Sequence, residues 1–195
     1  MIKLEKKESD WKSKIIFSPE DAVIFNSSRL LMLFDVLDRM KIKNGIDMER
    51  LCYYDFFAAN PFLILSKEDP MRLEIEIEGF EPNKLEYMST PQRYRTKRAS
   101  IKQYLSLLLS KGLIKVINKE GKILYEITQL GVEVSGKINS MYAMAYRKSV
   151  SCVVRMLKNL SDRQLSEKAS EWLEARSFQV DLYDMVDGVD EQNKD

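Results

Sequence analysis

The sequence TPQRYRTKRASIKQYLSLLLSKGLIKVINKEGKILYEITQLG, residues 90–131, decides the fold of this chain. Thr90 before Pro91 is typical of an N-cap followed by the first turn of a helix. Apolar residues then recur at helical spacing, which predicts one buried stripe made of Ile101, Tyr104, Leu105, Leu108 and Leu109. Gly112 supplies the left-handed residue with which helices commonly end.

Two short apolar runs follow this helix, Leu113 to Ile117 and Ile123 to Ile127. The residues between them, Asn-Lys-Glu-Gly at 118–121, predict the turn of a β-hairpin. Thr128 can then cap a helix that carries Gly131 in its first turn. We therefore predict a mainly α (α+β) fold, with a winged helix-turn-helix core, a two-stranded wing and a C-terminal helical module.

The residues before this stretch predict the first two helices of the core. One helix starts at Ser28 and stops at Asn44-Gly45, with an apolar stripe made of Leu30, Leu31, Leu33, Phe34 and Leu37. The other starts at an N-cap, Asp47, and is broken by Asn60-Pro61. Its inward residues are Leu51, Tyr54, Phe57 and Ala58.

An insert at residues 61–89 separates these helices from the third. Leu73 to Glu78 alternates strictly between apolar and acidic residues, which predicts a strand with one acidic face. That face is interpreted as a solvated, charged sheet edge. An insert of this length suggests a functional segment or one packed against a partner.

The predicted organisation has four parts. Residues 1–27 form an N-terminal arm that includes Ile15-Ile16-Phe17, and residues 28–131 form the winged-helix domain with its insert. Residues 132–176 form the C-terminal helical module, whose last helix starts at Ser161-Asp162 and turns Leu165, Ala169, Trp172 and Leu173 inward. Residues 177–195 form an acidic tail that we expect to fray.

Composition limits the chemistry that the chain can perform. A net charge of +1 gives no overall field that would attract nucleic acid or a membrane. The chain has no histidine, which removes Ser-His and Cys-His activation and the usual catalytic zinc sites. Its two cysteines, Cys52 and Cys152, lie in apolar helical patterns and are predicted to be buried thiols, not a disulfide or a ligand pair. Neither a signal peptide nor a membrane span is indicated, so we expect a cytoplasmic protein.

The clearest charge feature is a basic third helix. Residues 90–119 contain eight basic residues and no acid: Arg93, Arg95, Lys97, Arg98, Lys102, Lys111, Lys115 and Lys119. Arginines at the start of such a helix can meet DNA phosphates, and all of this set except Lys115 are our candidate contacts. The same charges could dock on an acidic partner, or balance acids elsewhere in the chain.

Other candidate sites are weaker. Glu76 and Glu78 share the predicted strand face and Glu120 lies in the hairpin turn, but none has a converging partner for metal chemistry. No phosphate-binding glycine motif is present, so we predict no catalytic residue, no metal and no cofactor. Core packing is the ordinary role for an aromatic run, but this one could also form a partner interface: Tyr53, Tyr54, Phe56 and Phe57.

Several short motifs, in order, resemble the middle components of bacterial ABC-three-component systems. The first is Ile46-Asp47-xx-Arg50-Leu51-xx-Tyr54-Asp55. The arginines Arg93, Arg95 and Arg98 follow, entering a helix that ends Lys111-Gly112-Leu113-Ile114. The rest are Gly121 to Tyr125, Gly131, Ser140-Met141-Tyr142-Ala143 and Leu160-Ser161-Asp162, so the resemblance covers residues 20–175.

This resemblance implies a small non-catalytic subunit placed between an SMC/Rad50-like ABC ATPase and an effector, often a nuclease. Such operons include the Lamassu-type anti-phage and anti-plasmid defence systems. The implied protein is a subunit of a hetero-oligomer without a membrane partner, similar in role to the winged-helix accessory proteins of SMC complexes. Two other functions stay open: a stand-alone winged-helix transcription regulator that binds double-stranded DNA, and an enzyme or toxin-like effector.

Overall fold

The fold of the chain was obtained as a computed structural model, which describes residues 22–42, 45–81 and 89–175. Its elements follow the order α1 (Val23–Arg39), α2 (Met48–Ala59), the short 3-10 helix η2 (Pro61–Leu63), α3 (Pro70–Ile77), α4 (Thr90–Ser110), β1 (Ile114–Lys119), β2 (Lys122–Ile127), α5 (Gln129–Gly136), α6 (Met141–Leu157) and α7 (Asp162–Ala175). The described part is mostly helical with a two-stranded antiparallel sheet, so the predicted mainly α (α+β) class is confirmed.

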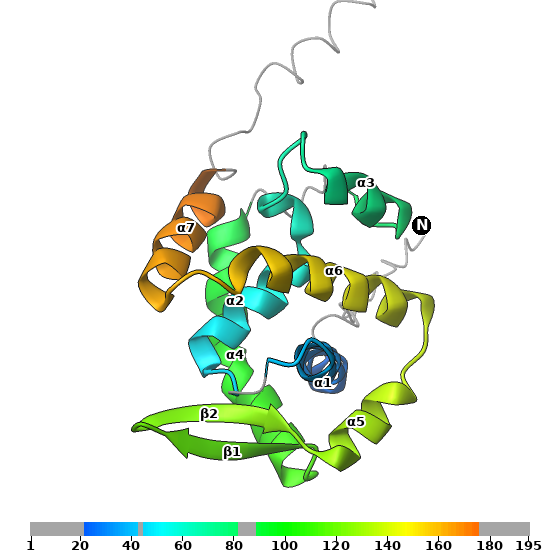
Figure 1. The fold of residues 1–195 in the computed structure, drawn as a ribbon, viewed down its shortest axis with the longest axis vertical. Coiled ribbons are helices and arrows are strands. Elements are labelled where there is room, and N and C mark those ends of the chain that lie inside the picture. Colours follow the sequence, from blue (N-terminus) through cyan, green and yellow to red (C-terminus); the bar gives the residue numbers. More distant parts are fainter. Residues whose placement is uncertain (1–21, 43–44, 82–88, 176–195) are drawn as a thin grey trace, which may run out of the picture.

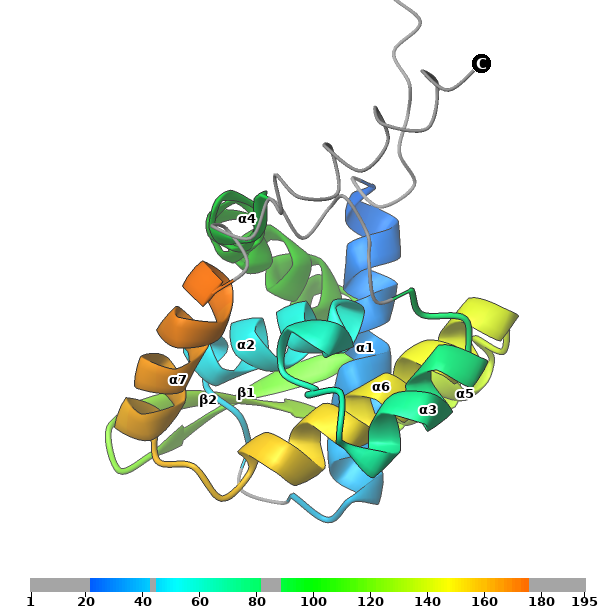
Figure 2. The ribbon, with the colours of Figure 1, turned by 90° about the horizontal axis from the view of Figure 1, so that it is seen from above.

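Helix α1 forms the centre of the protein. Figure 1 looks down this helix and shows α2, α4, α5, α6 and the hairpin arranged around it. Most of its length is buried, because apolar residues occupy nearly every side of the helix from Leu30 to Leu37. Helix α6 crosses both α1 and α2, as the view from above also shows (Figure 2). Helix α6 therefore packs on the same hydrophobic core as α1 and α2.

Local capping signals explain where several helices start. The Asp47 carboxylate accepts a hydrogen bond from the Arg50 backbone N–H at 2.9 Å, which confirms the predicted start of α2. Thr128 caps α5 in the same way through the N–H of Gly131, at 3.1 Å. Ser140 caps α6 through Ala143 and divides the predicted apolar pattern after residue 132 into two helices.

The hairpin is tighter than predicted. β1 and β2 pair from Ile114 with Ile127 to Lys119 with Lys122, which leaves only Glu120 and Gly121 in the turn. Both have positive φ, 52° and 79°, as a two-residue hairpin turn of the favoured hand requires. Ile46 forms an isolated antiparallel bridge with Tyr125 of β2. The residues just before α2 are therefore hydrogen-bonded to the hairpin.

The predicted strand in the insert is wrong, because Leu73 to Glu78 belongs to helix α3 and its C-cap. Asp69 caps this helix by accepting from the Met71 N–H at 2.9 Å, and Pro70 occupies the first turn. Six alternating residues are too few to outweigh those two start signals. The acidic strand face therefore does not exist.

Some helices begin at residues other than those predicted. Helix α1 begins at Val23, five residues before Ser28, and α4 begins at Thr90 with Ser89 as its N-cap. Helix α7 ends at Ala175, with Leu165, Ala169 and Leu173 buried as predicted and Trp172 half-buried. Ile15-Ile16-Phe17, Asn44 and the tail at 177–195 lie outside the described residues. Within the described ranges, no helix is long and apolar enough to cross a membrane.

Candidate functional site

The basic residues of α4 lie on two different sides of that helix. Arg95, Arg98 and Lys102 are exposed and follow an i, i+3, i+7 spacing, so they share one side, which we call the basic flank. Arg93 and Lys97 point to another side, toward the start of α1 and the end of α2. The sequence predicts one basic surface, whereas the fold separates these charges.

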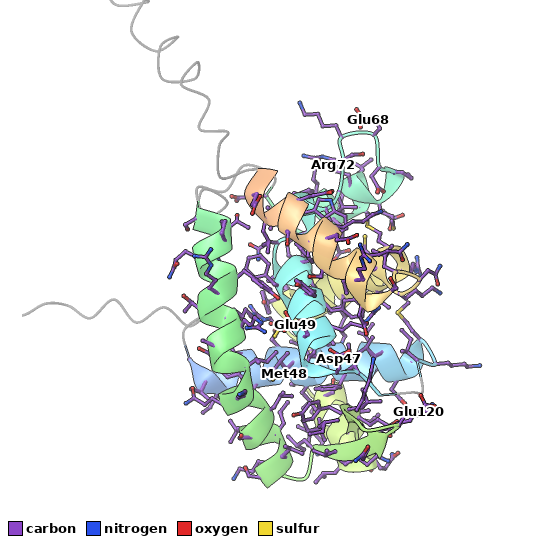
Figure 3. All side chains as sticks on the ribbon, turned by 90° about the vertical axis from the view of Figure 1, so that its left-hand side faces the viewer. Asp47, Met48, Glu49, Glu68, Arg72 and Glu120 are labelled. Atoms are coloured by element: carbon purple, nitrogen blue, oxygen red, sulfur yellow. The ribbon has the colours of Figure 1, made fainter. Side chains whose placement is uncertain are left out.

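The basic flank is open to solvent, and one of its charges is partly neutralised. The Arg98 guanidinium lies 2.8 Å from the Glu49 carboxylate, with both side chains about half exposed, at 53% and 42%. Figure 3 shows Glu49 in the first turn of α2, beside α4. An exposed pair of this kind is worth less than about 1 kcal/mol, so Arg98 can exchange its partner. Lys111 and Lys119 are exposed farther along, at the end of α4 and next to the hairpin turn.

On the inner side of α4, Lys97 joins a buried charge cluster centred on Asp55. Asp55 is 1% exposed and accepts two hydrogen bonds from the Arg29 guanidinium, at 3.0 and 3.2 Å. The Lys97 ammonium lies 2.6 Å from Oδ2 of the carboxylate, and the Tyr146 hydroxyl donates to Oδ1 at 2.6 Å. These four residues come from α2, α1, α4 and α6, so the cluster connects the four helices of the core.

The cluster holds more positive than negative charge. Burial raises the pKa of the Asp55 carboxyl above its ordinary value, although Arg29 and the Tyr146 hydrogen bond act to lower it. Lys97 acts in the same direction because its ammonium also contacts the carboxylate. Two cations, Arg29 and Lys97, therefore share a single carboxylate inside the protein.

A cavity of about 280 Å³ opens between α1, α2 and α4 next to this cluster. Arg29 of α1 and Lys97 of α4 line it, and so does Arg93 from the first turn of α4. Phe56 and Tyr104 provide apolar surface. Among the described residues that line it, none is acidic.

A second buried carboxylate, Asp35, fastens α1 to α5 and α6. It accepts two hydrogen bonds from Arg39 and one from the Ser135 hydroxyl, at 2.9, 2.8 and 2.9 Å, and Arg147 lies 3.9 Å away. The sequence did not assign a role to Asp35 or Arg29, and Asp55 entered only as the last residue of a family motif. Each of the three is a charged residue inside or directly beside an apolar helical stripe, and this pattern indicates a buried charge that needs a partner.

The candidate aromatic interface lies inside the core. Tyr53, Tyr54, Phe56 and Phe57 are between 0% and 8% exposed. The Tyr53 ring stacks on Tyr94 with 5.3 Å between centroids, and Phe57 meets Trp172 edge-on at 5.5 Å. This burial favours the core-packing role. Contact of these rings with a partner stays a prediction.

The three candidate carboxylates do not come together. Glu76 pairs with Arg72 on α3 and Glu78 pairs with Lys148 on α6, whereas Glu120 occupies the hairpin turn. Figure 3 shows Arg72 and Glu120 at opposite ends of the molecule. No group of histidine, cysteine or acidic residues in the described ranges is arranged to hold a metal ion.

Both cysteines are free and buried, as predicted. Burial raises the pKa of the Cys52 thiol to about 12 and that of Cys152 to about 11, so both stay protonated at neutral pH. A thiol, unlike a thiolate, is a poor nucleophile and a poor metal ligand.

Arg50 and Asp162, which are 112 positions apart in the sequence, meet at the start of α7. Arg50 donates to the Asp162 carboxylate at 2.7 Å and to the Leu160 carbonyl at 2.8 Å, and Lys122 lies 3.4 Å from the other Asp162 oxygen. The hydrogen bond from Arg50 lowers the pKa of Asp162 below its ordinary value. This contact joins α2, the hairpin and α7.

We expect the Asp162 carboxyl to titrate below about pH 3.9, the value of a free aspartate, in an NMR pH titration of the folded protein. Because its folded pKa is lowered, its contribution to stability is complete above the unfolded pKa and is lost as the pH falls toward the folded one. Arg50→Gln should move the pKa back up. The contribution should stay under about 1 kcal/mol, because the carboxylate is largely solvated. An unshifted pKa in the wild-type protein would contradict the contact.

Taken together, the fold and these surfaces define a mainly helical protein with an exposed basic flank and a basic cavity, in which the described acidic residues do not converge on a metal site. The chain belongs to the family described as ABC-three component (ABC-3C) system Middle Component 2, which it matches over residues 25–177. No curated protein and no solved structure matches the chain.

Proposed function

We propose that this chain is the non-catalytic accessory subunit that joins an SMC/Rad50-like ABC ATPase to an effector in a bacterial anti-phage or anti-plasmid defence complex of the Lamassu type. The observation that carries this proposal is the family match, which spans residues 25–177 and hence nearly all of the described fold. A middle component belongs to a system of several components, so the proposal assigns its role to binding. The effector in this proposal is a nuclease.

The order of elements supports a winged-helix interpretation. Helices α1, α2 and α4 are followed directly by the β1-β2 hairpin, and α3 interrupts the series between the second and third helices. In this interpretation α4 is the third helix of the winged helix and the hairpin is its wing. Helices α6 and α7 then extend the core that those elements form.

Exposed apolar side chains support the proposal that the chain binds other subunits. Leu73 and Ile77 lie one turn apart on α3 and are 65% and 75% exposed. Met141 and Met144 on α6 are 84% and 55% exposed. Large apolar side chains that recur on one protein at this exposure often mark surfaces that bind other proteins.

The proposal includes a contact between the basic flank and double-stranded DNA held by the complex. Arg95, Arg98 and Lys102 are exposed on one side of α4, and the sequence from Thr90 to Lys119 carries no acid that would repel phosphate. Lys97 is not part of this contact because it lies on another side of α4, where it faces Asp55. Docking of the same flank on an acidic surface of the ATPase is the competing role.

Replacing Arg95, Arg98 and Lys102 with glutamine together should weaken DNA binding by the assembled complex. If all three meet phosphates, the slope of log affinity against log salt concentration should flatten by up to about 3 units, near 0.9 per lost contact. The control changes Lys137, Lys158 and Lys168 to glutamine, which removes the same charge from other exposed positions. Fluorescence anisotropy at several salt concentrations gives both slopes.

The outcomes separate the two roles of the flank. A complex that assembles but has lost DNA affinity supports the DNA contact. A complex that no longer assembles supports docking on an acidic partner. If the variant assembles and binds DNA with the slope of the control, the flank is only a solvated surface and this part of the proposal is wrong.

The joining role is tested by co-expressing the three components with an affinity tag on this chain. We expect the tag to retain both the ATPase and the effector through size-exclusion chromatography. The purified chain alone should neither cut DNA nor hydrolyse nucleotides. A chain that stays monomeric beside its partners and binds a promoter on its own would favour the regulator instead.

A further inference from the structure

We propose that the cavity between α1, α2 and α4 is a binding site for a small molecule that carries a phosphate group. The site is formed by Arg29 and Lys97, with polar side chains from the N-terminal half of α4 and the end of α2. It is separate from the basic flank, which lies on another side of α4. The proposal therefore goes beyond the subunit role and does not depend on it.

An excess of buried positive charge beside the cavity favours the binding of an anion. Arg29 and Lys97 are both largely buried, with side chains 7% and 13% exposed, and share the single carboxylate of Asp55. A buried charge without a full counter-charge costs free energy. An anion bound in the cavity would supply the missing negative charge.

Both cations also keep N–H donors that are not used within the cluster. The Arg29 guanidinium has five N–H donors; it directs two of its nitrogens to Asp55 and also makes a hydrogen bond with Tyr142, which leaves donors over. The Lys97 ammonium has three donors, of which one faces Asp55 and one faces the Asn26 amide oxygen at 3.4 Å. Arginine and lysine with capacity to spare are the side chains that recognise phosphate.

The size and lining of the cavity also suit such a ligand. At about 280 Å³ it offers the volume of roughly nine water molecules, each taking about 30 Å³ of the liquid. Asn60, Thr96 and Ser100 add amide and hydroxyl groups at its wall. Phe56 and Tyr104 add aromatic surface, on which the planar part of a ligand can lie. The cavity therefore suits a phosphate ester better than a bare ion.

The test measures binding of inorganic phosphate and of AMP to the full chain by isothermal titration calorimetry at constant ionic strength. Lys97→Met is the informative variant, because it keeps the long apolar stem and removes one of two cations from Asp55. Arg29 and Tyr146 still satisfy the carboxylate, so the ligand-free variant should have a melting temperature equal to or above that of the wild type. Its affinity for both probes should fall at least tenfold.

Lys158→Met is the control, since it makes the same change at an exposed lysine after α6 that belongs neither to the cavity nor to the basic flank. It should bind both probes as the wild type does. Tighter binding of AMP than of phosphate would identify the ligand as an aromatic phosphate ester, whereas equal binding would identify the phosphate group alone.

Three results would overturn the proposal. One is a wild-type protein that shows no saturable heat with either probe at millimolar concentration. Another is a Lys97→Met variant that binds as well as the wild type. The third is an equal loss of affinity in both lysine variants, which would indicate attraction to surface charge and not a site.

Discussion

Replacing Asp55 with asparagine should lower the free energy of unfolding by about 3–5 kcal/mol, because it leaves two buried cations without their carboxylate. Arg29 and Lys97 lie 3.0 and 2.6 Å from Asp55, and neither has another acidic partner among the ion pairs of the described residues. Tyr146 would also lose the charged acceptor of its hydroxyl. Urea unfolding followed by circular dichroism measures the loss, and the far-UV spectrum tells whether any folded protein remains.

Glu49→Gln is the control for this experiment. It also removes a carboxylate from α2 and also breaks an ion pair with α4, but the pair with Arg98 is exposed to solvent. Its cost should stay below about 1 kcal/mol. If Asp55→Asn proved as mild as Glu49→Gln, the buried cluster would not hold the four helices together as described.

Gly131→Ala should destabilise the protein by about 3 kcal/mol, the upper end of what overpacking a core usually costs. A Cβ on Gly131 would lie 2.1 Å from the Leu113 carbonyl oxygen and 2.7 Å from Ile127 Cγ1. The carbonyl cannot retreat easily, because it accepts the Thr128 N–H at 3.0 Å and lies 3.1 Å from the Thr128 hydroxyl. The start of α5 and the base of the hairpin would have to separate.

Gly136→Ala provides the matched control at the other end of α5. A Cβ there would meet no atom within 4 Å, so alanine should leave stability unchanged or raise it by up to about 1 kcal/mol. Thermal unfolding of the two variants side by side gives the comparison. Equal melting temperatures would contradict the close approach of Gly131 to Leu113.

Local signals in the sequence predict the helices and the hairpin well. Asp47, Thr128 and the 118–121 turn each act within three or four residues, and the structure places a cap or a turn at all of them. The strand predicted in the insert is wrong because two local signals conflict there. The alternation from Leu73 to Glu78 predicts a strand and the start signals Asp69 and Pro70 predict a helix, and the structure has the helix.

Contacts between distant residues could not be predicted in this way. Nothing in the sequence brings Arg50 to Asp162 or Lys97 to Asp55, because those distances depend on how the helices cross. The division of the basic residues on α4 is an intermediate case. Helical spacing alone would have placed Lys97 on the same stripe as Ile101 and Tyr104, which is the buried side.

The joining role is the central claim, and one measurement tests it most directly. The ATPase and the effector are purified separately, mixed with and without this chain, and their masses are determined by size-exclusion chromatography with light scattering. We predict one species that contains all three proteins when the chain is present, and two separate species when it is left out. An ATPase and an effector that associate equally well without the chain would contradict the account.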